Sequence, residues 1–354
     1  MTFISAPGTF ILISLAVAVG SGCTAGVPAT ITPVFVSTSV PASADSVFVA
    51  SDAWAPRAGN SFELFAVGAS SQATRLTFCT GCQALGAAPS LDRTRIALRR
   101  ASADTNRDGR LDDLDRVSLL LVDLARQIEG PFLPDGWSNS SVDWASDGTF
   151  LIHTSSPDGG ADDLYQIDSN AQNNQRILVT PNVRERGARL NAAITRVVYE
   201  RIDGLGAGRS EIWIFASSTN QVKLTDSGIV GEPLAGTLYL VGSDAGPDYS
   251  PDGLSVVFRR LTSNSVAGGA WDILVVPITG GAPRVIASGP QFRSNPDWSK
   301  DGSKDGIVFS ESNPTTGGTD IVIIDPSTGA RRVLQSFGNG FKAGAPRWIA
   351  GIAG

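Results

Sequence analysis

A recurring turn motif constrains this chain more than any other sequence feature. Residues 247–253 read PDYSPDG, and the apolar residues Val256, Val257 and Phe258 follow. Pro and Asp preset a tight turn, and Gly accepts the left-handed backbone conformation. The β-branched and aromatic residues after it favour a buried, pleated strand. The motif therefore predicts a strand, an Asp-Gly turn and a second strand.

Copies of this motif recur along the sequence. Near copies lie at 142–148 (VDWASDG) and 296–302 (PDWSKDG), a truncated copy lies at 346–351 (PRWIAG), and degenerate copies lie at 89–98 and 189–200. The aromatic positions Tyr249, Trp298 and Trp348 are about 50 residues apart, which is the repeat length that indicates an array. A period of roughly 40–50 residues with about four short strands is typical of a propeller blade.

The repeats predict an all-β fold, a six-bladed β-propeller of four-stranded blades closed by strands from both termini. Most units also contain a strand that opens on an acidic residue, as at 163–168, 211–215, 272–276 and 320–325. The first unit lacks a turn strand, and the C-terminal copy around Trp348 would supply it, because closing a ring removes open sheet edges. The predicted units are 45–77 with 340–351, 78–133, 134–180, 181–227, 228–288 and 289–336. Strand positions are predicted at Val47, Val49, Val256, Phe258, Val308 and Phe309.

The turn motif followed by an acidic-led strand resembles the blades of TolB-type propellers over about residues 45–351. The resemblance implies a propeller domain. TolB itself has an α/β domain before its propeller, and residues 24–44 are too few for one, so its partner binding does not carry over. Prolyl oligopeptidases have a similar propeller, but their hydrolase domain has no counterpart here.

The N-terminal residues predict export. Residues 1–22 are expected to be a signal peptide of the lipoprotein type, because the apolar run at 3–19 is too short for a comfortable membrane span and Gly20-Ser21-Gly22-Cys23 resembles a lipoprotein cleavage box. Cys23 would carry the lipid. The alternative is an ordinary signal peptide with a bystander Cys. Residues 23–44 are small, polar and Pro-containing, which predicts a flexible tether before a propeller at 45–354.

Two further cysteines, Cys79 and Cys82, are predicted to form a disulfide in an oxidising compartment. A zinc site would need two more soft ligands, and the sequence has a single His. A thioredoxin-like role would need a helix N-terminus in a βαβ context, which the pattern does not provide.

Residues 104–115 match a twelve-residue calcium loop within an insertion at 103–116. Calcium prefers six to eight oxygen ligands, and this spacing wraps oxygens around one point, with Gly109 at the sharp turn. The loop resembles those of EF-hands and dockerins. One structural calcium ion is therefore predicted, and the alternative is a solvated acidic insertion. The predicted ligands are Asp104, Asn106, Asp108, the carbonyl of Arg110, Asp112 and Asp115.

The charge pattern and the remaining candidate side chains, His153, Trp54 and Trp137, constrain the function less. The formal net charge of −6 argues against nucleic acid as a partner, and the interspersed basic residues form no patch for an anionic membrane, so the lipid would be the membrane contact. A monomer is expected. His153 is expected to be packed or at the surface, and Trp54 and Trp137 either pack locally or stack on a sugar or peptide.

These features predict an exported, lipid-anchored propeller in the periplasm or at the cell surface that acts as a binding or scaffold module for a protein or glycan partner in the cell envelope. We expect no enzyme activity, because the sequence has no Gly-x-Ser-x-Gly elbow and only one His. The alternative is a secreted propeller hydrolase or lyase that acts on a carbohydrate or peptide through carboxylates in the central channel. The propeller fold alone does not decide between them.

Overall fold

The computed structural model describes residues 46–51, 62–68, 73–77, 81–124, 126, 128–134, 136–157, 160–204, 207–217, 219–229, 231–266, 268–299, 306–338 and 342–349. They all belong to one of the two compact units into which the chain divides, Pro33–Gly354. Every helix or strand among them is a β-strand, which confirms the predicted all-β class. No helix in the described part is long and apolar enough to cross a membrane. Cys23, Trp54, Cys79 and the predicted signal peptide and tether lie outside these residues.

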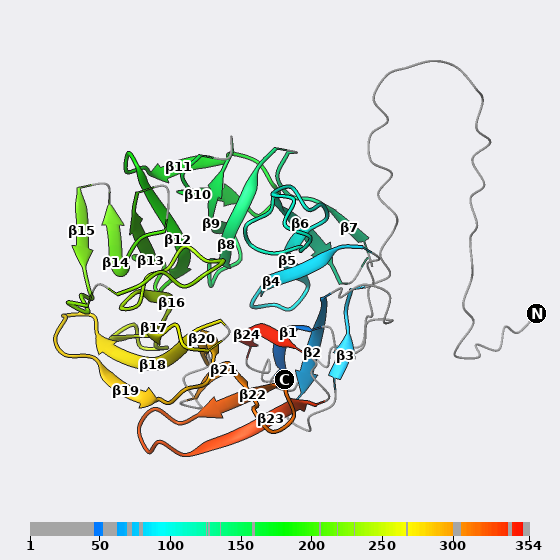
Figure 1. The fold of residues 1–354 in the computed structure, drawn as a ribbon. Helices are drawn as coiled ribbons and strands as arrows, with labels where there is room; N and C mark the ends of the chain where they lie inside the picture. The colour runs from blue at the N-terminus through cyan, green and yellow to red at the C-terminus, as the bar shows by residue number, and fades with distance from the viewer. Residues whose placement is uncertain are drawn as a thin grey trace, which may run out of the picture. The chain divides into compact units, whose positions relative to one another are not determined.

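The described strands form six antiparallel four-stranded sheets (Figure 1). The sheet that unites both ends of the chain contains β1 (Ser46–Ser51), β2 (Glu63–Gly68), β3 (Ala73–Arg75) and β24 (Ala343–Ile349). The second contains β4 (Gln83–Pro89), β5 (Arg95–Ala101), β6 (Val117–Asp123) and β7 (Ile128–Pro131). The third contains β8 (Ser138–Trp144), β9 (Phe150–Ser156), β10 (Asp163–Asp168) and β11 (Gln175–Leu178).

The other three sheets repeat the same order. The fourth contains β12 (Val183–Leu190), β13 (Val197–Asp203), β14 (Ser210–Ser217) and β15 (Asn220–Lys223). The fifth contains β16 (Asp244–Tyr249), β17 (Ser255–Ser263), β18 (Ala270–Pro277) and β19 (Arg284–Ala287). The sixth contains β20 (Arg293–Trp298), β21 (Ile307–Ser312), β22 (Thr319–Ile324) and β23 (Arg331–Phe337). Each sheet falls within a predicted unit, except that β23 runs one residue past it.

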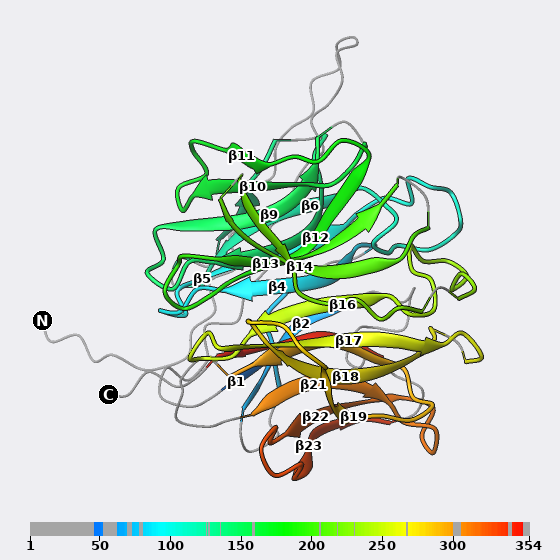
Figure 2. The ribbon, with the colours of Figure 1, turned by 90° about the vertical axis from the view of Figure 1, so that its left-hand side faces the viewer.

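The sheets are arranged as the four-stranded blades of a propeller. The innermost strands β4, β8, β12, β16, β20 and β24 each contact the next, and β24 contacts β4, so the contacts close into a ring (Figure 1). Figure 2 shows from the side how the sheet of β16–β19 lies against the sheet of β20–β23. Such face-to-face packing buries the inner faces of neighbouring sheets.

The first and last described strands meet in one sheet, as predicted. β1 pairs with β24 in antiparallel register, and Val47 lies opposite Trp348. All six predicted strand positions lie in strands, and Val47, Val256, Phe258, Val308 and Phe309 are buried. The C-terminal strand therefore supplies the innermost of the four strands of the first sheet.

The aromatic anchors of the repeat fill the spaces between sheets. Trp298 packs with Val257 and Ile273 of the preceding sheet, and Trp348 packs in the same way with Val308. Burying an apolar side chain of this size contributes roughly 1.5–3 kcal/mol. The anchors thus hold each blade on the one before it, which fixes the geometry at the centre of the ring.

Candidate functional site

Each of the six innermost strands carries a β-bulge, where its pairing register with the next strand shifts. The shifts fall at 84–86 in β4, 139–141 in β8, 186–189 in β12, 245–248 in β16, 294–297 in β20 and 344–347 in β24. Described bulge residues with positive φ are Gly86 (153°), Gly187 (62°), Gly246 (60°), Asn295 (44°) and Ala345 (48°). A bulge bends its strand and re-aims neighbouring side chains, so these six bulges shape the centre of the propeller.

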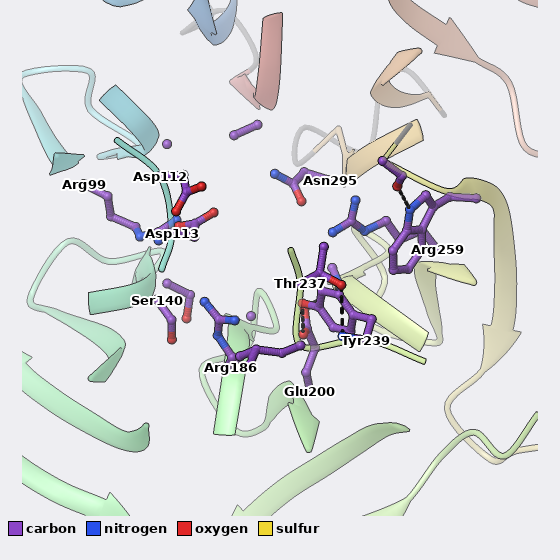
Figure 3. Close-up of a pocket in the computed structure, with 18 of the residues that line it drawn as sticks. Arg99, Asp112, Asp113, Ser140, Arg186, Glu200, Thr237, Tyr239, Arg259 and Asn295 are labelled. Atoms are coloured by element: carbon purple, nitrogen blue, oxygen red, sulfur yellow. Dashed lines mark hydrogen bonds and ion pairs between the residues drawn. The ribbon is translucent and has the colours of Figure 1, made fainter. Parts of the chain in front are cut away.

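The bulges line a central pocket of about 310 Å³ (Figure 3). Every innermost strand contributes to its wall, and the segment between β15 and β16 adds Thr237 and Tyr239. The loop between β5 and β6, which holds the predicted calcium site, adds Asp112 and Asp113. Ligand pockets commonly lie where rigid strands converge in this way.

Arginines outnumber acidic residues among the side chains that line the pocket. The arginines are Arg99, Arg186, Arg189, Arg259 and Arg347, whereas the acidic residues are Asp112, Asp113 and Glu200. The protein as a whole has the opposite balance, with a net charge of −6. The pocket is therefore a local concentration of positive charge in an acidic protein.

Three of these arginines are paired with carboxylates: Arg347, described below, and Arg99 and Arg186. Arg99 forms an ion pair with Asp113, whose side chain is half-exposed, and its Nε donates to the carbonyl of Asn139 at 3.1 Å. The Nε of Arg186 lies 3.3 Å from Oδ2 of Asp162. Desolvation by the surrounding pocket residues would raise the pKa of Asp113, but Arg99, Arg186 and Arg259 together hold it below its usual value. The electrostatic potential around Asp113 therefore favours a negatively charged group.

Arg259 is held by an aromatic surface. Its guanidinium lies over the ring of Trp271, 4.1 Å from the centroid, and its Nη1 donates to the carbonyl of Arg293 at 3.2 Å. Figure 3 shows this guanidinium directed into the pocket, between Asn295 and Tyr239. Stacking on an indole fixes the plane of a guanidinium while leaving its edge available to an incoming group.

Glu200 of β13 is fully engaged in hydrogen bonds. Its Oε1 accepts the backbone N–H of Gly246 at 2.7 Å, and its Oε2 accepts the hydroxyl of Tyr239 at 2.8 Å. Burial and the nearby Glu200 both raise the pKa of Tyr239, so this hydroxyl stays a hydrogen-bond donor at neutral pH. A Cβ at Gly187 would lie only 2.5 Å from Oε1 of Glu200, so the bulge in β12 requires glycine.

A second set of charged residues lies next to the pocket, one position before each aromatic anchor. Three aspartates of this set accept the backbone N–H of the residue at the anchor position in the following sheet. These hydrogen bonds join Asp143 to Leu190 (2.9 Å), Asp248 to Trp298 (2.7 Å) and Asp297 to Trp348 (2.7 Å). Each aspartate therefore fastens one blade to the next, as a charge-assisted hydrogen bond in a buried site.

Arg347 of β24 joins this set across the centre of the ring. It forms an ion pair with Asp143 in the third sheet, and its Nη1 lies 3.4 Å from Oδ1 of Asp297 in the sixth. The second sheet has the small residue Ala88 at the equivalent position. Arg347 also lines a smaller cavity of about 120 Å³, together with Trp144 and Trp348. The guanidinium thus lies between the two cavities.

The predicted calcium loop is present as an insertion between β5 and β6, and Gly109 has the positive φ (84°) that its predicted turn requires. Its carboxylates, however, accept backbone N–H groups. Asp104 bonds Asp108 and Gly109, and the buried Asp115 bonds Thr105 at 2.7 Å and Asp112 at 3.0 Å. Within the described residues, no three His, Cys, Asp or Glu side chains are gathered closely enough to hold a metal ion. The oxygen donors suit calcium chemically, and the calcium site stays a prediction.

The other described candidate residues from the sequence pack against neighbouring side chains outside the central pocket. His153 is fully buried, contacts Ser155 and Asn174 through its two ring nitrogens, and stacks on Tyr165. Trp137 packs edge-on against the same Tyr165, with ring centroids 5.0 Å apart, so it packs locally. Cys82 is buried, but its predicted partner Cys79 is not described, so the disulfide stays a prediction.

Sequence reasoning missed the pocket arginines and the blade-joining aspartates. Arg186 lies in β12 and Arg259 in β17, and nothing in their local sequence marks them. The aligned repeats place Asp143, Asp248 and Asp297 at one equivalent position. That alignment identifies the position but does not show that each carboxylate bonds the following blade.

Comparisons with known proteins support the fold. No family model matches the chain, and no curated protein sequence matches it. Similar solved structures include TolB from Acinetobacter baumannii (TM-score 0.62, 16% identity, covering 86% of this chain and 66% of that one). Others are a nidogen/laminin complex (0.61, 10%, 87% and 100%) and a putative TolB from Agrobacterium tumefaciens (0.56, 14%, 87% and 99%). At these identities the likeness shows a shared fold: the chain folds as a β-propeller similar to those of TolB structures.

Proposed function

We propose that this protein is an exported, lipid-anchored β-propeller that binds a protein or glycan partner of the cell envelope through the face that carries the central pocket. The observation that carries this proposal is the pocket itself. It is built on six rigid inner strands and lined by an excess of arginine. Rigid strands hold binding groups more accurately than loops do. The likeness to TolB structures agrees with a binding role but does not identify a partner.

The states of the pocket carboxylates favour binding over hydrolysis or lyase chemistry. Carboxylate catalysis usually needs two acids whose oxygens can face a substrate bond from either side. Glu200 uses both oxygens in hydrogen bonds, and Asp113 is paired with Arg99. Asp112 accepts the N–H of Leu114, and partial burial raises its pKa. A secreted hydrolase or lyase remains the alternative, and release of product from a carbohydrate or peptide would establish it.

Export and anchoring complete the proposed function. Cys23 is proposed as the first residue of the mature protein, with lipid on its sulfur, and the tether at 23–44 would hold the propeller away from the membrane. Replacing Cys23 with Ser and fractionating cells tests the anchor. The variant should move from the membrane to the soluble fraction, and an unchanged distribution would contradict the anchor without affecting the pocket.

We also propose that the loop at 104–115 takes up one calcium ion as a local structural element. To do so, Asp104 and Asp115 would have to exchange their backbone hydrogen bonds for the ion. The loop contributes Asp112 and Asp113 to the pocket wall, so calcium would order part of the binding face and take no part in chemistry.

Site-specific crosslinking tests the binding role. Thr237, at the pocket, and Leu254, an exposed residue in the turn between β16 and β17, would each be replaced by a photoreactive phenylalanine analogue. The first variant should crosslink one envelope partner in cells, and the second should not. Equal crosslinking from both positions, or none from position 237, would contradict the proposed binding face.

A further inference from the structure

The pocket contains an arginine with no anionic partner. Among the described residues, no carboxylate lies within ion-pair distance of Arg259, and its Nε is buried without a hydrogen-bond partner. A partly buried guanidinium that keeps unused donors costs free energy that an anion bound at its open edge would recover. Such an arrangement is typical of a site that waits for a negatively charged group.

The acids at the pocket do not satisfy this arginine. Glu200 is bonded to Gly246 and Tyr239 through its two oxygens, and Asp113 is bonded to Arg99. Arg186, whose Nε faces Asp162, extends its guanidinium toward the pocket beside Ser140 in Figure 3. Arg186 and Arg259 therefore present two positively charged groups to a space of about 310 Å³.

The neighbouring polar groups suit a planar anion. Asn295 points into the pocket from its bulge, and a side-chain amide there can donate to a second oxygen (Figure 3). Guanidinium groups match the two oxygens of a carboxylate in a bidentate geometry. The volume is sufficient for a side chain or the end of a peptide, and is at the lower limit for a drug-sized ligand.

The aromatic side chains of the pocket favour a peptide over a sugar. An apolar face of a sugar ring needs an open aromatic face to stack on. One face of Trp271 carries Arg259, and its ring meets Tyr239 edge to face, with centroids 5.4 Å apart. The hydroxyl of Tyr239 is taken by Glu200. The described pocket residues thus favour a charged group that needs guanidinium contacts rather than stacking.

We propose that the central pocket binds the carboxylate of an acidic peptide segment, supplied by an Asp or Glu side chain or by the free carboxyl terminus of the peptide, between Arg186 and Arg259. This inference rests on the proposed binding function and names the chemistry of the partner. Because the contact is electrostatic in a partly open pocket, binding should weaken as salt is added.

Peptide display followed by affinity measurement tests the proposal. Random heptapeptides with free C-termini would be selected on the purified protein, and the affinity of recovered peptides would be measured by fluorescence anisotropy. Recovered peptides should share a carboxylate at one position. Amidation of that group, or Arg259→Gln, should each weaken binding about tenfold or more, since a charge-assisted pair contributes about that factor.

A double-mutant cycle identifies the contact. If Arg259 holds the carboxylate, amidated peptide and Arg259→Gln together should cost little more than either change alone. The matched control is Arg201→Gln, because Arg201 also stacks on a tryptophan, 4.6 Å from the ring of Trp213, but lies outside the pocket. Circular dichroism would check folding, and Arg259→Lys offers a milder variant that keeps the charge and should bind with intermediate affinity.

Several outcomes would overturn the proposal. These are failure to recover any peptide, recovered peptides that lack a shared carboxylate, and additive losses in the cycle. Glutarate binding as tightly as the peptides would show a site for free small carboxylates, and binding of trigalacturonate alone would point to an acidic glycan. If the crosslinked envelope partner is retained equally by Arg259→Gln, this inference fails and the proposed function stands. If no partner is crosslinked but peptides bind through Arg259, the proposed function fails and the peptide-binding inference stands.

Discussion

The backbone N–H of Trp348 donates to Oδ2 of Asp297 at 2.7 Å, and this bond joins the last strand of the propeller to the blade before it. The same aspartate lies 3.4 Å from Arg347. One side chain therefore serves both the blade-to-blade hydrogen bond and the charge set that separates the two cavities. Ring closure and the separation of the two cavities therefore depend on the same residues.

Removing this aspartate should destabilise the whole propeller. Asp297→Ala leaves the N–H of Trp348 and part of Arg347 without a buried partner, which should lower the free energy of unfolding by about 3–5 kcal/mol. Urea unfolding followed by tryptophan fluorescence measures this change. Asp325→Ala is the control, because Asp325 only caps a turn at the surface, and its cost should be several-fold smaller. Equal costs would contradict the role of Asp297 in closure.

Two glycines with similar backbone angles should respond differently to alanine. A Cβ added at Gly187 (φ 62°) would lie 2.5 Å from Oε1 of Glu200, whereas a Cβ added at Gly253 (φ 68°) would have no atom nearer than 4.0 Å. Gly253→Ala should cost only the left-handed backbone, about 1 kcal/mol. Gly187→Ala should cost more and also displace Glu200 from Tyr239, which weakens ligand binding. Unfolding and binding assays on both variants measure the difference, and similar values would argue against the steric contact.

The single histidine predicts loss of stability in acid. Burial lowers the pKa of His153 to about 4, against 6.5 in the unfolded state. Between these values the unfolded state binds the proton and the folded state does not, so stability falls as pH decreases from 6.5 toward 4, by up to about 3 kcal/mol. His153→Gln should remove this slope. An imidazole NMR signal that titrates near pH 6.5 in the folded protein would refute the prediction.

Glu185 of β12 should give stability the opposite pH dependence. Burial raises the pKa of its carboxyl to about 8 from 4.5. The folded state then holds a proton that the unfolded state releases, so stability falls as pH rises from 4.5 to 8, by up to about 5 kcal/mol. Glu185→Gln should flatten this decline and leave the variant more stable than the parent at pH 8. Thermal melts at pH 5 and pH 8 compare the two proteins, and a parallel decline in both would be inconsistent with a buried acid.

The sequence predicted the blade well and the site poorly, for a physical reason. The Asp252-Gly253 turn and the apolar run from Val256 to Phe258 are local signals, so they can be recognised in a single sequence. The same signals recur in other repeats, which strengthens the prediction of a blade. The pocket depends on relationships between distant residues, as when Arg347 reaches Asp143 across 204 positions. The charge of the pocket depends on which residues of different sheets come together at the centre of the ring. No short pattern around Arg186 or Arg259 encodes that arrangement. The acidic loop was located from its spacing, but the partners of its carboxylates were not.

Calcium removal tests the loop at 104–115. Extracellular calcium modules bind with dissociation constants of about 10⁻⁴ to 10⁻³ M, and a loop whose carboxylates already bond its own backbone should lie in that range. At ten times the dissociation constant, calcium would stabilise the folded state by roughly 1.4 kcal/mol. Chelator should therefore leave the propeller folded, because its cores lie between the sheets, and should make only the loop sensitive to protease.

Asp104→Ala should abolish the calcium-dependent protection while leaving the unfolding transition of the propeller nearly unchanged. Asp147→Ala, in an exposed Asp-Gly turn, is a control that removes an acid without touching the loop. Absence of calcium uptake at millimolar concentration in isothermal titration would refute the site. The hydrogen bonds that the backbone N–H groups of Thr105 and Asp112 donate to Asp115 would then account for the conformation of the loop. Global unfolding in chelator would instead show that the ion supports more than one loop.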